Sequence, residues 1–171
     1  QPSNIKAIKE DYLNSPDILD PKNAYACSKR QAENLCSLYH HHYGIDFVIA
    51  RCFAFLGPYL PLNQHFAIGN FILDGLSEND ILINGDGKTI RSYLFADDLS
   101  DWLFKILLNG KSGEAYNVGS NENITIHDLA KLVSKCFNSK PQIKIIGKPS
   151  EFVDRYVPNV DKIKNDLMAT Q

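Results

Sequence analysis

Segments with helical periodicity alternate along this chain with short apolar runs, and that alternation constrains the fold more than any other feature. Residues 25–43 repeat apolar side chains at three- and four-residue steps, and Gly44 follows as a helix stop. The apolar run at residues 45–50 comes directly afterwards and has the pattern of a buried parallel strand. Helices that alternate with strands predict α/β layers and exclude all-α and all-β folds.

Three segments are expected to be irregular: residues 1–22, residues 53–64 and a polar tail from Pro149. Elsewhere helices and strands continue to alternate. The remaining expected elements are a helix through residues 66–76, a hairpin over residues 81–95 turning at 84–87, a helix beginning at Asp97 and Asp98, a strand at 116–118, a helix from Thr125 to about Phe137, and a strand at 143–146. Thr125 and Asp128 resemble a capping box with Asp in place of Glu.

Composition excludes several kinds of partner. Lys and Arg number 18 and Asp and Glu number 20, which leaves a net charge of -2. A nucleic-acid binder or a polybasic membrane anchor usually has a basic excess, so neither partner is expected. No apolar run approaches the roughly 20 residues that span a bilayer, and residues 1–4 lack the features of a secretory signal. We therefore expect a cytoplasmic protein.

Cysteine and histidine placement predicts no metal site. None of the four cysteines forms a Cys-x-x-Cys pair, so free thiols in a reducing compartment are expected. His40, His41 and His42 are successive, and successive helix positions point about 100° apart, so the three rings cannot converge on one ion. The paired Asp97 and Asp98 are explained by the preference for negative charge at a helix start.

Tyr25 and Lys29 are the first candidates for chemistry. They lie four residues apart on the expected helix at 25–43 and therefore share one face. An ammonium beside a phenol favours the phenolate and lowers the phenol pKa from about 10. Such a tyrosine can exchange a proton with a substrate hydroxyl near neutral pH. An exposed Tyr and Lys on an ordinary helix is the alternative explanation of this pair alone.

The surroundings of this pair resemble the extended short-chain dehydrogenase/reductases, and most closely their nucleotide-sugar epimerase/dehydratase branch. The matching segments are residues 23–33 as the catalytic helix, 51–58 as the strand and loop with an Arg and a Gly-Pro, 85–99 as the sugar-nucleotide hairpin and the helix after it, 116–126 as a strand and the next helix start, and 154–158 as the late basic motif. Their order and spacing agree with that family over essentially the whole chain.

This resemblance implies hydride chemistry at a sugar carbon. Tyr25 matches the catalytic acid/base that acts on the sugar 4-hydroxyl, and Lys29 matches the residue that lowers its pKa and holds the nicotinamide ribose of NAD or NADP. Arg91 and Arg155 match the pair that grips the diphosphate of a nucleotide-diphosphate sugar, which suits the forked geometry of guanidinium groups. A surface salt bridge is the alternative role for either arginine.

One departure from the family pattern concerns the substrate. Ala54 stands where the family usually has an Asn that contacts the bound ligands. Asn63, His65 and Asn70 lie in the following substrate loop and are candidates to compensate for it. A polar residue that opens a helix is an equally simple reading of His65.

A second departure concerns the cofactor. The family binds the pyrophosphate of NAD(P) on a Gly-rich strand-turn-helix, and that motif is absent from this chain. Gly85-Asp86-Gly87 is followed by Ile90, so Gly-x-Gly-x-x-Gly fails. We therefore expect a fragment, the C-terminal half of an enzyme, with little activity of its own.

The expected architecture is the C-terminal part of a doubly wound, Rossmann-type domain plus a small substrate-binding subdomain. Residues 1–64 would form the first part, and residues 65–171 mainly the second, with some elements returning to the main sheet. The family commonly pairs through the Tyr-Lys helix, which implies a homodimer through residues 25–43. Alternatives are a nucleotide-sugar reductase or decarboxylase on the same scaffold, or a non-catalytic binding fragment.

Overall fold

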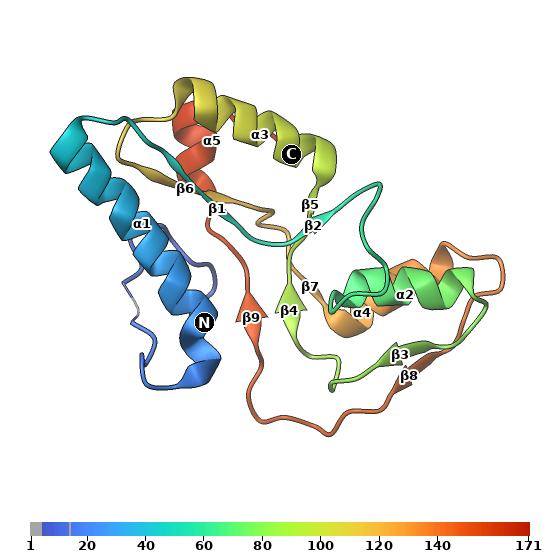
Figure 1. Ribbon diagram of the computed structural model, residues 1–171. Coiled ribbons are helices and arrows are strands. Elements are labelled where there is room, and N and C mark those ends of the chain that lie inside the picture. The colour runs from blue at the N-terminus through green and yellow to red at the C-terminus, as the bar shows by residue number, and fades with distance from the viewer. Residues whose placement is uncertain (1–4, 14) are drawn as a thin grey trace.

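The computed structural model describes residues 5–13 and 15–171, which form two lobes joined by short strands (Figure 1). In chain order the elements are η1 (Pro21–Asn23), α1 (Ala24–Tyr43), β1 (Ile49–Cys52), β2 (Phe55–Leu56), α2 (Ala67–Leu76), β3 (Ile81–Ile83), β4 (Ile90–Arg91), β5 (Leu94–Phe95), α3 (Ala96–Asn109), β6 (Ala115–Val118), β7 (Ile124–Thr125), α4 (Ile126–Lys135), β8 (Ile143–Ile145), β9 (Arg155–Tyr156) and α5 (Asp161–Leu167).

The large lobe contains α1, β1, β6, α3 and α5. Strand β1 pairs in parallel with β6, from Ile49 opposite Ala115 to Cys52 opposite Val118. Helices α3 and α5 pack on β6 and on each other. Trp102 is fully buried in this core, and its indole Nε1 donates to the carbonyl of Thr170 at 2.9 Å, so the bulky ring buries no unpaired donor.

The small lobe contains α2, β3, α4 and β8. The two helices pack on each other and on β3, which pairs in parallel with β8. Its buried core consists of Ile68, Phe71, Ile81, Ile83, Leu129, Ala130 and Val133. A Cβ at Gly75 would lie only 2.1 Å from the Phe137 ring, so glycine permits this close approach of α2.

Short strands connect the lobes and bring distant parts of the sequence together. Strand β4 lies between β7, which is antiparallel to it, and β9, which is parallel. Strand β2 pairs in parallel with β5. Figure 1 shows β4 and β9 side by side between the lobes. This strand pair therefore places residues 90–91 beside residues 155–156.

The α/β class and the predicted helices are confirmed, including the capping residue of α4. The Thr125 Oγ1 accepts a hydrogen bond from the Asp128 amide at 3.0 Å, as the predicted capping box requires. Among the described residues, no helix has both the length and the apolar character that a membrane span requires.

Three expectations about strands and the tail are wrong. The predicted hairpin at residues 81–95 does not form, because β3 pairs with β8 and β4 pairs with β7 and β9. The parallel strand predicted at 45–50 forms, but its predicted start is wrong, since the strand begins only at Ile49. The tail is not irregular, because it forms β9 and α5, with Val160, Ile163 and Leu167 buried at helical spacing.

Candidate functional site

Two cavities meet at a pair of stacked aromatic rings between the lobes. The rings of Phe53 and Tyr156 lie 4.5 Å apart between centroids with an interplanar angle of 23°. Both residues line a cavity of about 490 Å³ that also contains Arg91, here termed the Arg91 cavity. Both also line a cavity of about 750 Å³ that contains Tyr25, here termed the Tyr25 cavity. The two cavities are therefore neighbours across one aromatic pair.

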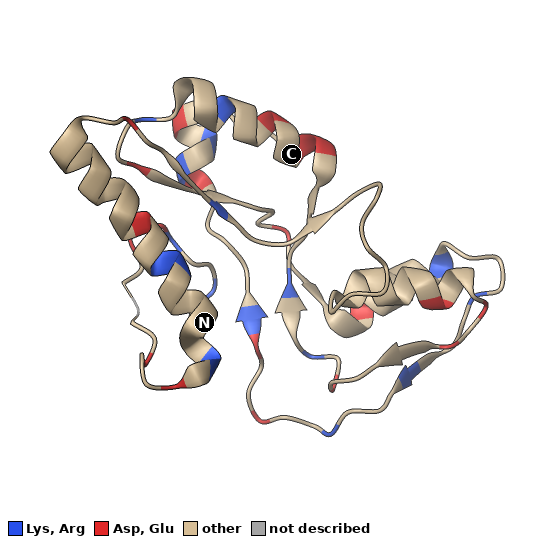
Figure 2. Cartoon of the chain, in the orientation of Figure 1, with Lys and Arg blue, Asp and Glu red and all other residues tan. Residues whose placement is uncertain are grey.

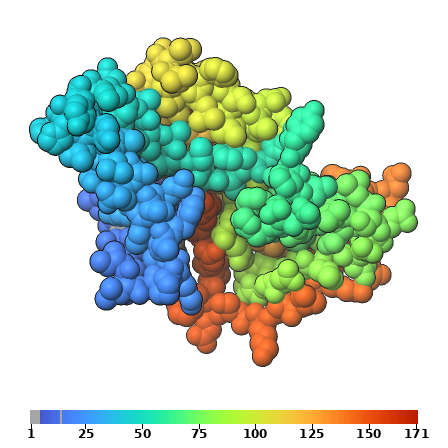
Figure 3. Space-filling model, in the orientation of Figure 1, coloured from blue at the N-terminus to red at the C-terminus, as the bar shows by residue number. Residues whose placement is uncertain are grey.

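The Tyr25 cavity lies between α1 and β1. Tyr25 and Lys29 line it from α1, as their spacing predicts, and the Lys29 Nζ lies 5.6 Å from the centre of the Tyr25 ring. Tyr25 is 74% exposed, so a bound molecule can reach this residue. Figure 3 shows the surface hollowed beside α1. The predicted acid/base pair therefore faces a cavity large enough for part of a ligand.

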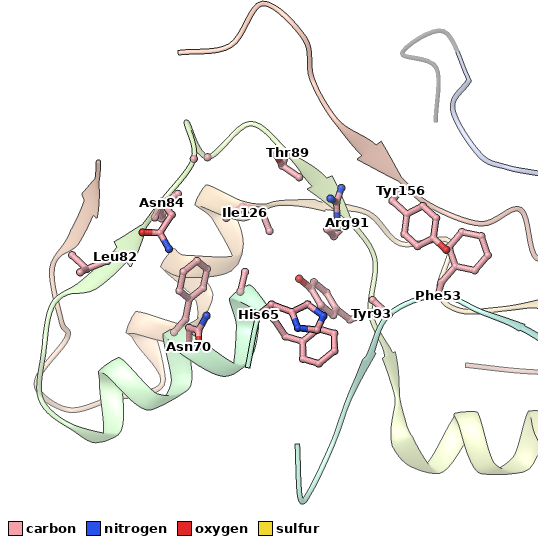
Figure 4. Close-up of a pocket in the computed structure, with 17 residues that line it drawn as sticks. Phe53, His65, Asn70, Leu82, Asn84, Thr89, Arg91, Tyr93, Ile126 and Tyr156 are labelled. Atoms are coloured by element: carbon pink, nitrogen blue, oxygen red, sulfur yellow. The ribbon is translucent and has the colours of Figure 1, made fainter. Parts of the chain in front are cut away.

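The Arg91 cavity contains three of the predicted substrate residues, namely Arg91, His65 and Asn70. Figure 4 shows Asn70 and Asn84 at one side of this cavity, Arg91 and Tyr156 toward the other, and His65 between them. The Arg91 Nη1 donates to the Ile90 carbonyl and its Nη2 to the Asp154 carboxylate at 2.5 Å. The guanidinium is therefore held in place at the cavity wall by its own strand and by the segment before β9.

Arg155 does not lie beside Arg91. In the β4–β9 register Ile90 is opposite Arg155 and Arg91 is opposite Tyr156, and successive strand residues point to opposite faces. The Arg155 Nε donates to the Lys6 carbonyl at 2.6 Å, and Arg155 lines a separate cavity with Lys6. Figure 2 shows the basic residues on the two neighbouring strands. The structure thus brings Arg91 together with Tyr156 and separates it from Arg155.

Asn63 and Ala54 are placed differently from each other. Asn63 is exposed and lines neither the Arg91 cavity nor the Tyr25 cavity, and its side chain accepts only a 3.5 Å bond from Gln64. Ala54 lines the Arg91 cavity beside Phe53. The small Ala54 side chain thus occupies the position at which the family pattern has an Asn that contacts the bound ligands.

Burial disfavours ionisation of the two phenols in the Arg91 cavity. It is the largest cause of a raised pKa at both Tyr93 and Tyr156. The positive charge of Arg91 opposes the rise at both, and the charge of Tyr25 adds to it at Tyr156. Neutral hydroxyl groups can donate hydrogen bonds to sugar or phosphate oxygens. Burial also raises the pKa of the Cys52 thiol in the Tyr25 cavity, which disfavours the thiolate.

The Gly-x-Gly segment helps to form the wall of the Arg91 cavity. Gly85 and Gly87 both line it, and Gly87 has a φ of +78°, which favours glycine. The Asp86 carboxylate accepts bonds from the Lys88 and Ser150 amides and so fixes this loop to the segment before β9. Among the residues that the structure describes, no group of three His, Cys, Asp or Glu side chains could hold a metal.

Sequence reasoning missed the aromatic residues and the amide that complete the cavities. Tyr156 follows Arg155 by one residue, and only the parallel register with β4 shows which of the two shares a face with Arg91. Phe53, Tyr93 and Asn84 also line the Arg91 cavity. The alternation of faces along a strand is the signal that could have favoured Tyr156, once the partner strand was known.

The comparisons with known proteins agree with this arrangement. The sequence profile of the "NAD dependent epimerase/dehydratase family" matches residues 2–119. The chain is 27% identical over 159 residues to UDP-glucuronic acid decarboxylase 1 of Arabidopsis thaliana, covering 93% of this chain and 36% of that protein. The profile match extends over more than half of the sequence, and the chain belongs to the NAD-dependent epimerase/dehydratase family.

Solved structures show the same fold. UDP-glucuronic acid 4-epimerase from Bacillus cereus, in complex with UDP-glucuronic acid and NAD, superposes with a TM-score of 0.79 at 26% identity and covers 96% of this chain and 51% of that one. DesIV, a dTDP-glucose 4,6-dehydratase from Streptomyces venezuelae with NAD and TYD bound, gives 0.77 at 25% identity, covering 96% and 49%. The likeness confirms the Rossmann-type class, and the chain spans about half the length of these structures.

Proposed function

We propose that this chain supplies the acid/base residue and part of the substrate site of a nucleotide-sugar epimerase or dehydratase. The observation that carries the proposal is the contact between the two cavities at Phe53 and Tyr156. One cavity holds a phenol beside an ammonium, and the other holds a guanidinium. A nucleotide-diphosphate sugar that lies across both would have its phosphates at Arg91 and its sugar near Tyr25.

In this proposal Tyr25 takes the proton of the sugar 4-hydroxyl through its phenolic oxygen. The Lys29 ammonium, 5.6 Å from the centre of the Tyr25 ring, would hold the nicotinamide ribose in this proposal. NAD or NADP, when bound, would supply the hydride acceptor for C4. Arg91 binds the diphosphate, and the neutral Tyr93 and Tyr156 hydroxyls donate to substrate oxygens. Since hydride transfer needs close, fixed geometry, the rigid placement of Arg91 serves to orient the substrate.

Cofactor binding in this proposal needs more than the described residues provide. Tyr25 and Lys29 would hold only the nicotinamide end, and no Gly-x-Gly-x-x-Gly sequence is present to cradle the pyrophosphate. The chain spans about half of the NAD-bound solved structures. We therefore propose that the 171-residue chain is a fragment that binds the nucleotide sugar but neither binds NAD(P) measurably nor turns the sugar over.

Calorimetric titration of the chain with UDP-glucuronic acid and with UDP tests the substrate site. Arg91→Ala should weaken binding by about 1.5–3 kcal/mol, the usual contribution of a charged hydrogen bond. Arg155→Ala removes the same charge from the other face of the strands and is the matched control, with affinity expected to be unchanged. Equal losses in both variants, or no loss in Arg91→Ala, would contradict the assignment.

The role of Tyr25 is tested in the longest form of the protein that shows turnover. Tyr25→Phe should lower kcat by orders of magnitude and leave nucleotide-sugar affinity nearly unchanged, because it removes only the group that transfers the proton. Unchanged turnover would exclude Tyr25 from the mechanism.

Decarboxylation is the second candidate reaction. The plant relative is a UDP-glucuronic acid decarboxylase, so carbon dioxide release from UDP-glucuronic acid is a direct test. A product of the same mass favours an epimerase instead, and loss of water favours a dehydratase.

Pairing of two copies through α1 is also part of the proposal. Leu35, Leu38 and Tyr39 are exposed on this helix, although helices in proteins usually bury an apolar face. Leu38→Asp should convert the dimer to a monomer in analytical ultracentrifugation, and a wild-type monomer at high concentration would exclude this dimer.

A further inference from the structure

Helix α1 carries the proposed acid/base pair, yet within the described single chain no buried apolar face fixes its orientation. None of its 20 residues is buried, and its N-cap residue Asn23 makes no capping bond through its side chain. Most helices in proteins are held by an apolar face packed on the rest of the molecule. Within one chain, a polar interaction is therefore the candidate that sets the direction in which Tyr25 and Lys29 point.

A two-bond ion pair joins α1 to strand β1. The Arg51 Nε donates to Glu33 Oε1 at 2.8 Å, and the Arg51 Nη2 donates to Glu33 Oε2 at 2.7 Å. About a third of each side chain is exposed, at 35% and 30%. The hydrogen bond that Arg51 donates to Glu33 is the largest cause of a raised Arg51 pKa, so the pair favours the charged guanidinium. A forked pair of this kind fixes both the distance and the relative orientation of its two groups.

Arg51 is itself tied to the rest of the large lobe. Its Nη1 donates to the Glu10 carbonyl at 2.6 Å. The Glu10 carboxylate in turn accepts a bond from the Asn117 amide at 2.9 Å, and Asn117 is opposite Arg51 in the β1–β6 register. The guanidinium thus connects α1 with both strands and with the segment at Glu10.

The spacing along α1 transmits this constraint to the acid/base pair. Tyr25, Lys29 and Glu33 are four residues apart, and each such step turns a helix by only about 40° beyond a full turn. All three side chains line the Tyr25 cavity, together with Arg51. Fixing Glu33 therefore fixes the rotation of the helix, and with it the face that carries Tyr25 and Lys29.

We propose that Arg51 and Glu33 are positioning residues that hold Tyr25 and Lys29 against the Tyr25 cavity. Their relevance to catalysis rests on the function proposed above, whereas the geometric claim can be tested without substrate. A lysine at position 51 would keep the charge but lose the fork, so Arg51→Lys is not conservative here.

Hydrogen exchange of the 171-residue chain tests the anchor. Arg51→Lys and Glu33→Gln should each speed exchange in residues 24–43 by about tenfold or more, given the usual strength of charged hydrogen bonds. Exchange in α3 should stay unchanged. The double variant that swaps the charges, Arg51→Glu with Glu33→Arg, should restore most of the protection. Asp101→Asn breaks an exposed ion pair with Lys105 within α3 and is the matched control, with no effect expected on α1.

The titration of Tyr156, followed by carbon NMR of the phenol, reports where Tyr25 points. The charge of Tyr25 raises the Tyr156 pKa, so Tyr25→Phe should lower it. If Tyr25 turns away in the Arg51→Lys variant, the Tyr156 pKa should also fall. The double variant Arg51→Glu with Glu33→Arg should reverse this fall.

Three results overturn the proposal. The first is unchanged protection of residues 24–43 in both single variants. The second is equal loss of protection in α1 and α3, since the pair would then support the whole lobe rather than orient one helix. The third is a Tyr156 pKa that responds to Tyr25→Phe but not to Arg51→Lys. None of these measurements involves a nucleotide sugar, so they fail independently of the proposed function.

Discussion

Helices α4 and α1 are held to the molecule by opposite means. Helix α4 buries Leu129, Ala130, Val133 and Ser134, and the Thr125 side chain caps its N-terminus. Helix α1 is twice as long, with 20 residues against 10, and buries none of them. Burial of apolar side chains holds α4, whereas the ion pair of Arg51 and Glu33 joins α1 to strand β1. The helix with the proposed acid/base pair is therefore the one whose position depends on charge.

The largest expected effect comes from truncating an aromatic ring in the core beneath α4. Phe71 is 2% exposed, and Phe71→Ala should lower the free energy of unfolding by about 3–5 kcal/mol through lost burial and the cavity left behind. In the Leu38→Asp background, which keeps the chain monomeric, Tyr39→Ala on α1, where the side chain is exposed, should change it by no more than about 0.5 kcal/mol. Urea denaturation measures both. Similar losses in the two variants would mean that α1 packs as α4 does.

Helix capping gives a smaller effect of the same sign. Thr125→Ala removes the hydroxyl that accepts the Asp128 amide and should cost about 1 kcal/mol. Asn23→Ala at the start of α1 removes no capping bond and should cost less. The Asn23 side-chain amide donates to the Asp17 carbonyl and does not cap the helix. Thermal unfolding of the two variants checks the order, and a larger loss for Asn23→Ala would reverse the comparison.

The sequence was sufficient for features that depend on local periodicity. Helices were located from three- and four-residue spacing, and the same rule placed Tyr25 and Lys29 on one face of α1. The capping residue Thr125 was recognised because its bond closes within three residues. Each of these features is determined by neighbours along the chain.

Features that depend on strand partners could not be predicted. Asn84 and the residues after it looked like a hairpin turn, yet β3 pairs with β8, which lies some sixty residues further on, so no local signal revealed the partner. The resemblance predicts that Arg91 and Arg155 grip the diphosphate together, but in the β4–β9 register Tyr156, and not Arg155, is opposite Arg91. A one-residue difference in register moves a side chain to the other face, and only the assembled sheet sets the register.

Acid titration gives the smallest expected difference between the two helices. The hydrogen bond from the Thr125 hydroxyl to Asp128 Oδ2, at 2.8 Å, is the main cause of a lowered Asp128 pKa, and Lys131 adds to it. Because the folded-state pKa lies below the ordinary value of 3.8, the folded protein binds this proton less readily than the unfolded chain does. The stabilisation is therefore complete above the unfolded-state pKa and is lost as the pH falls through the folded-state pKa. Asp128→Asn should reduce stability at pH values of about 5–7, and its difference from the wild type should shrink below about pH 3. Helix α1 has no acidic residue in its first turn and should show no such change there. Urea denaturation at a series of pH values measures the difference, and a gap that stays constant into the acid range would contradict this role of Asp128.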